Sequence, residues 1–464
     1  MAADLHLPHQ LTGANKSLTA QCHCKSVHFI VTVPTSALPL PVHLCHCHIC
    51  RYTHGTLCTF HAPLPKGVEP QFIASSSIAS SLTGYTHARA AAERFFCRTC
   101  GCHIGDRNLQ PDPETGKPEW HVATSIFSSH GEDTFQIRTH IFTNSAGGPG
   151  GVNLATWLPR INNRNIHVWD PPPNDPKYPL SPSPPPPSSS SSPPPQHHKP
   201  SKGEEEENEA DVGRRLRAQC HCGGISFTIP RPTASESADP FLSRFLHTTT
   251  TTSSSTSSNS RSRSSNNPAR PAGEKQATTA KRVATLCLCA DCRLTSGAHA
   301  VPWTFVPLAS LRPPPPPPLD LGSARGGGGG GGGGEGGEGG GYASLRTYRS
   351  SHNVTRGFCG VCGATALYMV DDPERVEGGP GNGEGKVVVV DVAVGLLRGD
   401  SDGDGDGGPA AERWLAWRTG RLAGWETGTE FDAGFAEALR DGLGRWGRER
   451  YGRVEEFEIP KAVE

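Results

Sequence analysis

Cysteines in short-spaced groups are the residues of this chain that are best suited to chemistry. Three patterns, C-x-C, C-x-C-x-x-C-R and C-x-x-C-G, occur in the same order twice along the sequence. Cysteines at such spacings bind soft or borderline metal ions as thiolates, and zinc is the usual ion in sites of this kind. We therefore expect zinc in each half of the chain.

Two of the three patterns in each half can together close a metal site. Structural zinc is commonly held by four thiolates that come from two short-spaced pairs distant in sequence. The C-x-C and C-x-x-C pairs meet this requirement, so we predict one structural zinc per half, contributing directly to folding. The predicted ligands are Cys22, Cys24, Cys97 and Cys100 in the first half, and Cys220, Cys222, Cys359 and Cys362 in the second.

The remaining pattern supplies three ligands and leaves a fourth position free, which is typical of catalytic zinc. Three thiolates give the zinc an overall charge of about −1, which favours a soft sulfur ligand over the generation of hydroxide. We predict a second zinc here, with a small thiol as its ligand. The triplets, which are also the candidate catalytic residues, are Cys45, Cys47 and Cys50, and Cys287, Cys289 and Cys292.

A histidine is an alternative fourth ligand for the first triplet. His46 and His48 stand between its cysteines, and either could close the site. Leu288 and Ala290 occupy the matching positions of the second triplet, so this alternative applies to the first triplet alone.

The cysteines must be positioned by two copies of one domain. The sequence AQCHC at residues 20–24 recurs at residues 218–222, and alternating apolar residues follow each time. This alternation predicts a half-buried strand directly after each C-x-C turn. Residues 121–124 and 391–394 are predicted to form equivalent buried strands. We therefore predict a mainly β fold of two tandem zinc-binding all-β domains, separated and interrupted by disordered low-complexity segments.

Composition indicates where these domains begin and end. Apolar residues make up 34% of the chain, and its 43 prolines and 55 glycines gather in a few stretches that cannot bury enough apolar surface to offset the entropy of ordering. We predict a first domain over residues 16–168, a disordered Pro/Ser/Glu linker over 169–213 and a second domain over 214–452. Disordered insertions are expected near 248–281 and 313–341. We call the two domains the first and the second copy.

Charge and hydropathy narrow the partners and the location. The 44 basic and 45 acidic residues leave a formal net charge of −1, so nothing indicates attraction to nucleic acid. We find neither a secretory signal nor an apolar run of about 18 residues, and we expect a cytoplasmic protein without a membrane partner. Cysteines in that compartment stay reduced, as metal ligation requires.

A helix is predicted near the end of the chain. Phe431, Phe435, Leu439 and Leu443 recur at helical spacing. Apolar residues at this spacing form one face of an amphipathic helix, so we expect this helix to dock on the rest of the protein.

The ordered set C-x-C, C-x-C-x-x-C-R and C-x-x-C-G resembles the glutathione-dependent formaldehyde-activating enzyme family, which shares its domain with centromere protein V. The resemblance implies a β-tent fold, with a structural zinc on the two pairs and a catalytic zinc on the triplet. It also implies a carbon-sulfur lyase-type activity that joins formaldehyde to glutathione as S-(hydroxymethyl)glutathione. Glutathione and an aldehyde are then the expected partners. Arg51 and Arg293 become candidates for binding the glutathione carboxylates, with local pairing as the alternative.

Two other classes of function remain open. A zinc-stapled interaction module without catalysis needs only the closed four-cysteine sites. A carrier of glutathione or zinc needs the open triplet but performs no reaction on its ligand. An enzyme needs the open site to be accessible and exchangeable, and this requirement separates it from the other two classes.

Overall fold

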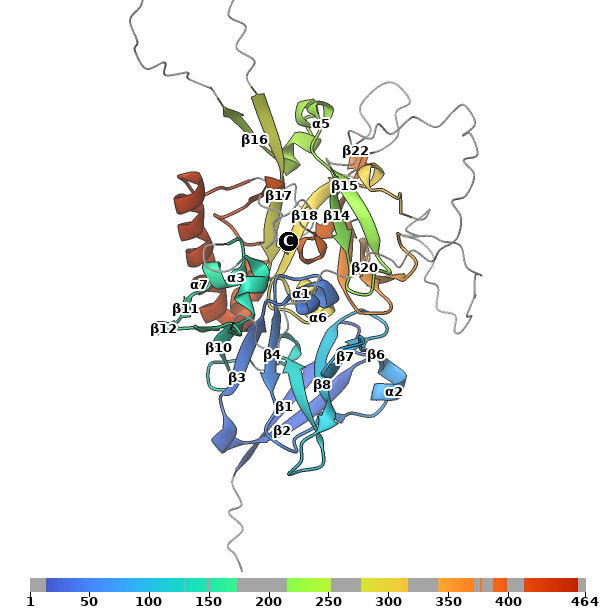
Figure 1. The fold of residues 1–464 in the computed structure, drawn as a ribbon, viewed down its shortest axis with the longest axis vertical. Helices are drawn as coiled ribbons and strands as arrows, with labels where there is room; N and C mark the ends of the chain where they lie inside the picture. The colour runs from blue at the N-terminus through green and yellow to red at the C-terminus, as the bar shows by residue number, and fades with distance from the viewer. Residues whose placement is uncertain are drawn as a thin grey trace, which may run out of the picture.

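The computed structural model describes residues 14–128, 130–147, 151–172, 215–251, 277–315, 341–370, 376–377, 387–398 and 413–457. Within these residues the fold is mainly β, which confirms the predicted class. Figure 1 shows one β-rich half for each copy, with a long C-terminal helix beside them. Nearly all of the predicted linker, and the interior of both predicted insertions, lie outside the described residues.

The first copy is built on one large sheet with the strand order β13-β10-β3-β4-β9-β8-β7-β6. A small sheet, β1-β2-β5, carries the first C-x-C turn. The bounds are β1 (Asn15–Gln21), β2 (His28–Pro34), β3 (Leu40–Cys45), β4 (Thr59–Pro63), β5 (Gln71–Phe72), β6 (Leu82–Tyr85), β7 (Ala92–Cys97), β8 (His103–Pro111), β9 (Pro118–Ala123), β10 (Phe135–Ile141) and β13 (His167–Trp169). A short pair, β11 (Arg160–Ile161) and β12 (Arg164–Asn165), lies outside both sheets.

The second copy repeats this arrangement. Its large sheet has the order β16-β17-β18-β23-β21-β20-β19, and β24 lies parallel to β17 as β10 lies parallel to β3. The bounds are β14 (Arg215–Gln219), β15 (Ser226–Pro230), β16 (Leu246–Thr251), β17 (Ala277–Cys287), β18 (Val301–Pro307), β19 (Leu345–Ser351), β20 (Val354–Cys359), β21 (Thr365–Val370), β22 (Val376–Glu377), β23 (Val387–Ala393) and β24 (Leu415–Trp417). Strands β16 and β17 pair across the first predicted insertion, so the margins of that insertion are ordered into a hairpin.

Short helices connect these strands. They are α1 (His48–His54), α2 (Ile78–Ser81), α3 (Leu154–Trp157), α5 (Ala234–Ala238) and α6 (Ala290–Ser296), with the long α7 (Trp425–Tyr451) at the end. Helix α1 contacts the 3-10 turn after β23, and α6 contacts the equivalent turn after β9, so each helix reaches across to the other copy. Both helices lie near the centre of Figure 1.

Alternation of burial confirms the predicted strands after the C-x-C turns. In β2 the side chains of Phe29 and Val31 are fully buried while their neighbours are partly exposed. Phe227 and Ile229 alternate in the same way in β15. Because one face of each strand packs into the core, the register of the small sheets is fixed and the C-x-C turns are held in place.

Two glycines allow the copies to approach each other to backbone contact. Gly55 ends α1 and Gly297 ends α6, with φ of 73° and 78°. A Cβ at Gly55 would collide with the carbonyl oxygen of Thr365, and a Cβ at Gly297 would collide with that of His103. Thr365 and His103 begin the equivalent strands β21 and β8. The copies therefore meet with approximate two-fold symmetry, as the subunits of an isologous dimer do.

Helix α7 joins the two copies, and the predicted docking helix is confirmed. Phe435, Leu439 and Leu443 are buried, and the helix packs against α3 and β11 of the first copy. The ring of Trp157 in α3 packs edge-on against Trp446 in α7. None of the described helices combines the length and the apolar character needed to cross a membrane.

Replacement of Gly55 by alanine tests the backbone contact between the copies. We expect Gly55→Ala to lower the thermal unfolding midpoint strongly, since the new methyl group displaces the Thr365 carbonyl. The matched control is Gly116→Ala, because Gly116 also has a positive φ of 67° but no atom within 4 Å of an added Cβ. The control should cost only about 1–2 kcal/mol for the left-handed backbone. Equal losses in the two variants would contradict the proposed interface.

Candidate metal centres

The predicted structural ligands come together in both copies. In each group of four cysteines the Sγ atoms all lie within 4.8 Å of one another. Cys24 Sγ is 3.5 Å from both Cys22 Sγ and Cys97 Sγ, and Cys222 Sγ is 3.4 Å from Cys359 Sγ. A tetrahedral zinc with Zn-S bonds of about 2.3 Å needs S-S separations of about 3.8 Å, so these groups fit zinc after slight expansion. We call them the closed clusters.

Local backbone geometry forms the C-x-x-C half of each closed cluster. Cys97 ends β7, and the following turn brings the Gly101 N–H to within 2.9 Å of the Cys97 carbonyl oxygen. The Gly363 N–H donates to the Cys359 carbonyl at the same distance. Both glycines have φ near 80°, a conformation that side chains disfavour, which explains why glycine follows each C-x-x-C pair.

The predicted triplets also come together, each at the start of a short helix. Cys47 caps the N-terminus of α1, where its Sγ accepts a hydrogen bond from the Cys50 N–H at 3.4 Å. Cys289 caps α6 in the same way, with the Cys292 N–H at 3.3 Å. Among the described residues no fourth cysteine, histidine or carboxylate joins either triplet. We call these groups the open triplets.

The histidine alternatives for the first triplet are not supported. His46 is fully buried, and its Nε2 lies 2.9 Å from His140 Nδ1, in a separate histidine pair. His48 lies on the first turn of α1, with its ring 6.3 Å from the Tyr52 ring centroid. Neither histidine belongs to the group of ligand atoms formed by the three cysteines.

The arginines that follow the triplets pair locally, which supports the alternative to carboxylate binding. Arg51 is 3% exposed and donates to the carbonyl oxygens of His46 and Ser145. Arg293 donates to the Ser125 carbonyl oxygen of the first copy and lies 3.7 Å from the centroid of the Phe431 ring. Both guanidinium groups thus form contacts within the protein, Arg51 within the first copy and Arg293 between the copies.

Another arginine approaches each open triplet and was missed from the sequence. Arg94 Nη2 lies 4.0 Å from Cys50 Sγ, and Arg356 Nη1 lies 3.3 Å from Cys292 Sγ. Burial alone lowers the pKa of Arg356, but the Cys292 thiolate outweighs burial and raises it. The available signal was the shared sequence R-x-F-C, which places an arginine three residues before each C-x-x-C pair.

Each closed cluster sends a histidine to the other copy. His221, between Cys220 and Cys222, shares a 2.6 Å hydrogen bond with the Tyr85 hydroxyl, and its backbone N–H donates to the Tyr52 carbonyl. His23, between Cys22 and Cys24, shares a 2.8 Å bond with the Tyr348 hydroxyl. The repeated histidine of the C-H-C motif is thus a contact between the copies.

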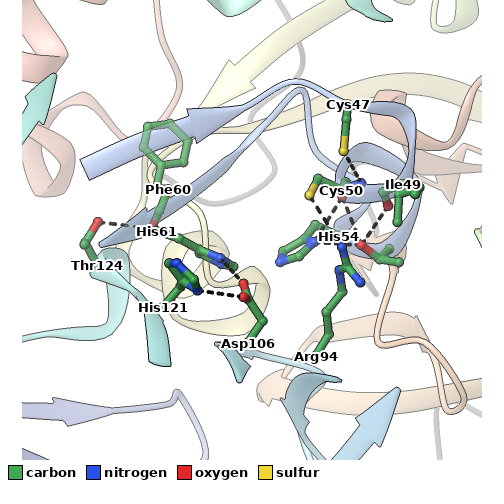
Figure 2. A network of polar contacts seen from close by, with 11 residues as sticks. Cys47, Ile49, Cys50, His54, Phe60, His61, Arg94, Asp106, His121 and Thr124 are labelled. Atoms are coloured by element: carbon green, nitrogen blue, oxygen red, sulfur yellow. Dashed lines mark hydrogen bonds and ion pairs between the residues drawn. The ribbon is translucent and has the colours of Figure 1, made fainter. Parts of the chain in front are cut away.

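The surroundings of the two open triplets differ. Beside the first, His61 Nδ1 and His121 Nδ1 lie 2.9 and 3.0 Å from the two carboxylate oxygens of Asp106, and Figure 2 shows both rings directed at that carboxylate. Burial raises the pKa of Asp106, but hydrogen bonds from His121 and His61 outweigh burial and hold this pKa well below its usual range. By sequence offset and strand register, His54, His61, His103, Asp106 and His121 correspond to Ser296, Trp303, Thr365, Tyr368 and Asp391 in the second copy.

Two partly exposed histidines near the first triplet also have no counterpart in the second copy. His48 and His87 are partly exposed, and the His87 ring lies 5.2 Å from that of His221. Burial, followed by the charge of Arg94, lowers the pKa of His87. Ala290 and Ser350 stand at the positions of His48 and His87 in the second copy, so its triplet lacks these two titratable groups.

Each mainly β copy thus has one closed cluster and one open triplet of cysteines that could hold zinc. Residues 17–145 match the family model of the glutathione-dependent formaldehyde-activating enzyme. The match lies within the first copy, and the second copy lies outside the matched range. Comparison with curated proteins gave no match.

The buried His103 predicts a loss of stability in acid. Its ring stacks on His54 at 3.6 Å, and burial lowers its pKa from 6.5 to about 3. In the unfolded chain the His103 ring takes up a proton below about pH 6.5. In the folded chain the same ring stays neutral until about pH 3. The free energy of unfolding therefore falls as the pH decreases from 6.5 toward 3, and His103 contributes about 2 kcal/mol of this loss at about pH 5.

Replacement of His103 by asparagine should therefore flatten the pH dependence of unfolding, measured with denaturant between about pH 5 and pH 7.5. The control is His121→Asn. Burial lowers the pKa of His121, but its hydrogen bond to the Asp106 carboxylate and the charge of that carboxylate outweigh burial and raise this pKa. Its stabilising contribution is present at low pH and is lost as the pH rises, so this variant should steepen the loss in acid. Parallel profiles for the two variants would contradict the assignment.

Proposed function

We propose that this protein is a zinc-dependent enzyme of the carbon-sulfur lyase type that acts on a small thiol adduct, such as S-(hydroxymethyl)glutathione. The observation that carries the proposal is the open triplet of Cys45, Cys47 and Cys50 with Arg94 beside it. The match of residues 17–145 to the glutathione-dependent formaldehyde-activating enzyme supports the choice of substrate.

The three thiolates and the arginine explain how a thiol is selected. Zinc bound at the triplet would accept a thiolate as a fourth, soft ligand. Four thiolates carry more negative charge than one divalent ion neutralises, and the Arg94 guanidinium supplies a positive charge next to Cys50. A hydrogen bond from a charged donor to sulfur in this partly dehydrated setting favours the thiolate over the thiol.

The reaction needs only positioning and the movement of one proton. In the synthetic direction the glutathione sulfur forms a bond to the formaldehyde carbon, the carbonyl π bond opens onto oxygen, and the proton of the thiol is transferred to that oxygen. The reverse reaction breaks the same carbon-sulfur bond. His87 and His221, which lie close together near Arg94, are the chain's candidates for carrying the proton.

The first copy is assigned the reaction because more histidines lie around its triplet than around the second. His48 and His87 have no equivalent beside Cys287, Cys289 and Cys292, where alanine and serine replace them. The second triplet keeps the three cysteines and the arginine, Arg356. This difference favours a second candidate function for that copy, which is to bind a thiol without transforming it.

Activity measurements on zinc-loaded full-length protein test the proposal. The rate of exchange between formaldehyde, glutathione and S-(hydroxymethyl)glutathione is measured by nuclear magnetic resonance. We expect Cys47→Ala to reduce the rate to the uncatalysed level and the matched variant Cys289→Ala to keep it. Arg94→Gln should lower kcat/KM roughly tenfold, the equivalent of about 1.4 kcal/mol, while Arg356→Gln leaves it unchanged.

Other outcomes of this experiment have definite meanings. A Cys47→Ala variant that keeps its zinc-dependent exchange rate contradicts the assignment of the first triplet. Loss of the rate in Cys289→Ala alone would move the active site to the second copy. Intact protein that accelerates no exchange but binds glutathione would support the carrier function instead.

A further inference from the structure

A third kind of candidate ligand cluster contains no cysteine and lies where the two copies and the C-terminal helix meet. It consists of His130, just before β10 of the first copy, His299, just before β18 of the second copy, and Asp432, inside α7. One ligand atom from each residue lies within 4.8 Å of the other two. We call these residues the junction cluster. None of its residues takes part in the proposed lyase activity.

Three of the four ring nitrogens of the junction cluster are buried and make no hydrogen bond within the described residues. The His130 side chain is 1% exposed, and neither of its ring nitrogens makes a hydrogen bond within the part of the chain that is described. Its Nδ1 lies 3.2 Å from Asp432 Oδ2 without hydrogen-bond geometry. His299 is 2% exposed, and its Nδ1 has no partner either. A buried polar nitrogen without a partner costs about 1–3 kcal/mol, so three of them at one point call for a ligand.

The second nitrogen of His299 is already held, which fixes the orientation of the ring. His299 Nε2 lies 3.0 Å from Thr124 Oγ1, and the ring lies parallel to that of Phe60 at 4.4 Å. A hydrogen bond on one imidazole nitrogen and a stacking partner are the usual means by which proteins orient a histidine ligand. This arrangement leaves Nδ1 as the free donor atom.

A break in α7 presents the carboxylate. Asp432 has φ of −153° and ψ of 88°, which are extended values inside an otherwise helical segment. Its Oδ1 accepts a hydrogen bond from the Phe435 N–H at 2.9 Å and so caps the second part of the helix. Oδ2 remains available on the side of His130. The kink thus places a negatively charged oxygen beside two imidazoles.

Aromatic rings and one cation surround the cluster. The rings of Phe431 and Phe135 lie 4.7 and 5.3 Å from that of His130, which limits access by water. The guanidinium carbon of Arg293 lies over the Phe431 ring, 3.7 Å from its centroid. Its positive charge opposes a second cation nearby, so we expect weaker metal binding here than at the cysteine clusters.

We propose that His130, His299 and Asp432 bind a divalent transition metal ion, with zinc as the expected ion, and that this ion joins the two copies and α7. Two imidazoles and one carboxylate are suitable ligands for zinc or cobalt, and they contain no sulfur. An ion bound to three segments that are distant in sequence stabilises their common arrangement, since the unfolded chain offers no such site.

The test compares metal content in full-length protein and in Asp432→Asn. Asparagine caps helices as well as aspartate does, so this change removes the charged ligand and keeps the capping hydrogen bond. After equilibration with zinc and gel filtration, we expect elemental analysis to show one zinc fewer per chain in Asp432→Asn and in His299→Asn. Asp441→Asn, a matched change at an exposed position of the same helix, should keep that zinc.

Cobalt substitution separates this site from the cysteine clusters. The absorption due to thiolate-cobalt charge transfer should be the same in Asp432→Asn and in the unmodified protein, because the cluster contains no sulfur. Zinc should also raise the thermal midpoint of the unmodified protein more than that of Asp432→Asn. Equal zinc content in the two proteins would overturn the proposal, as would a loss of zinc accompanied by a loss of the thiolate-cobalt absorption.

Discussion

Backbone contact between the two copies is the constraint on which the candidate sites depend. Gly55 and Gly297 end the two helices that carry the open triplets, and each lies against a backbone carbonyl of the other copy. A larger residue at either position would separate the copies. Because the helices that form the triplets are the same helices that form the contact, the metal sites and the assembly of the copies cannot vary independently.

This contact gives each open triplet surroundings drawn from both copies. His221 from the second closed cluster reaches the first copy beside His87, and His23 from the first closed cluster reaches Tyr348 and Asp291 of the second. A closed cluster therefore serves two purposes, since it holds its own strands together and orients a histidine toward the other copy. Duplication with an intramolecular interface also allows the copies to differ. His48 and His87, for example, lie near the first triplet, and alanine and serine replace them in the second copy.

The cysteine clusters and the mainly β fold could be predicted because their signals are local. Ligand spacing such as C-x-C and the alternation around Phe29 and Phe227 are fixed within a few residues. The contact between Arg94 and Cys50 could not be predicted, because it depends on where the fold places β7 relative to α1. The sequence leaves two roles open for Arg51, because it does not reveal that the guanidinium is buried against backbone carbonyls.

The junction cluster could not be predicted from sequence for a similar reason. His130, His299 and Asp432 belong to no repeated motif, and they are brought together only by the packing of both copies against α7. The fold of the second copy was predictable through its repeated cysteines, although its insertions hide the repeat from simple length comparison. The domain boundaries stay predictions where the linker and the insertions lie outside the described residues.

Addition of glutathione to the cobalt-substituted protein is the most direct test of the central claim, that the triplets are open sites for a thiol. A fourth thiolate at an open triplet increases the thiolate-cobalt absorption, and a closed cluster cannot respond in this way. We predict an increase that saturates with glutathione and persists in Cys289→Ala, where the first triplet is intact. An absorption unchanged by glutathione in both proteins would contradict the account and leave the cysteines a purely structural role.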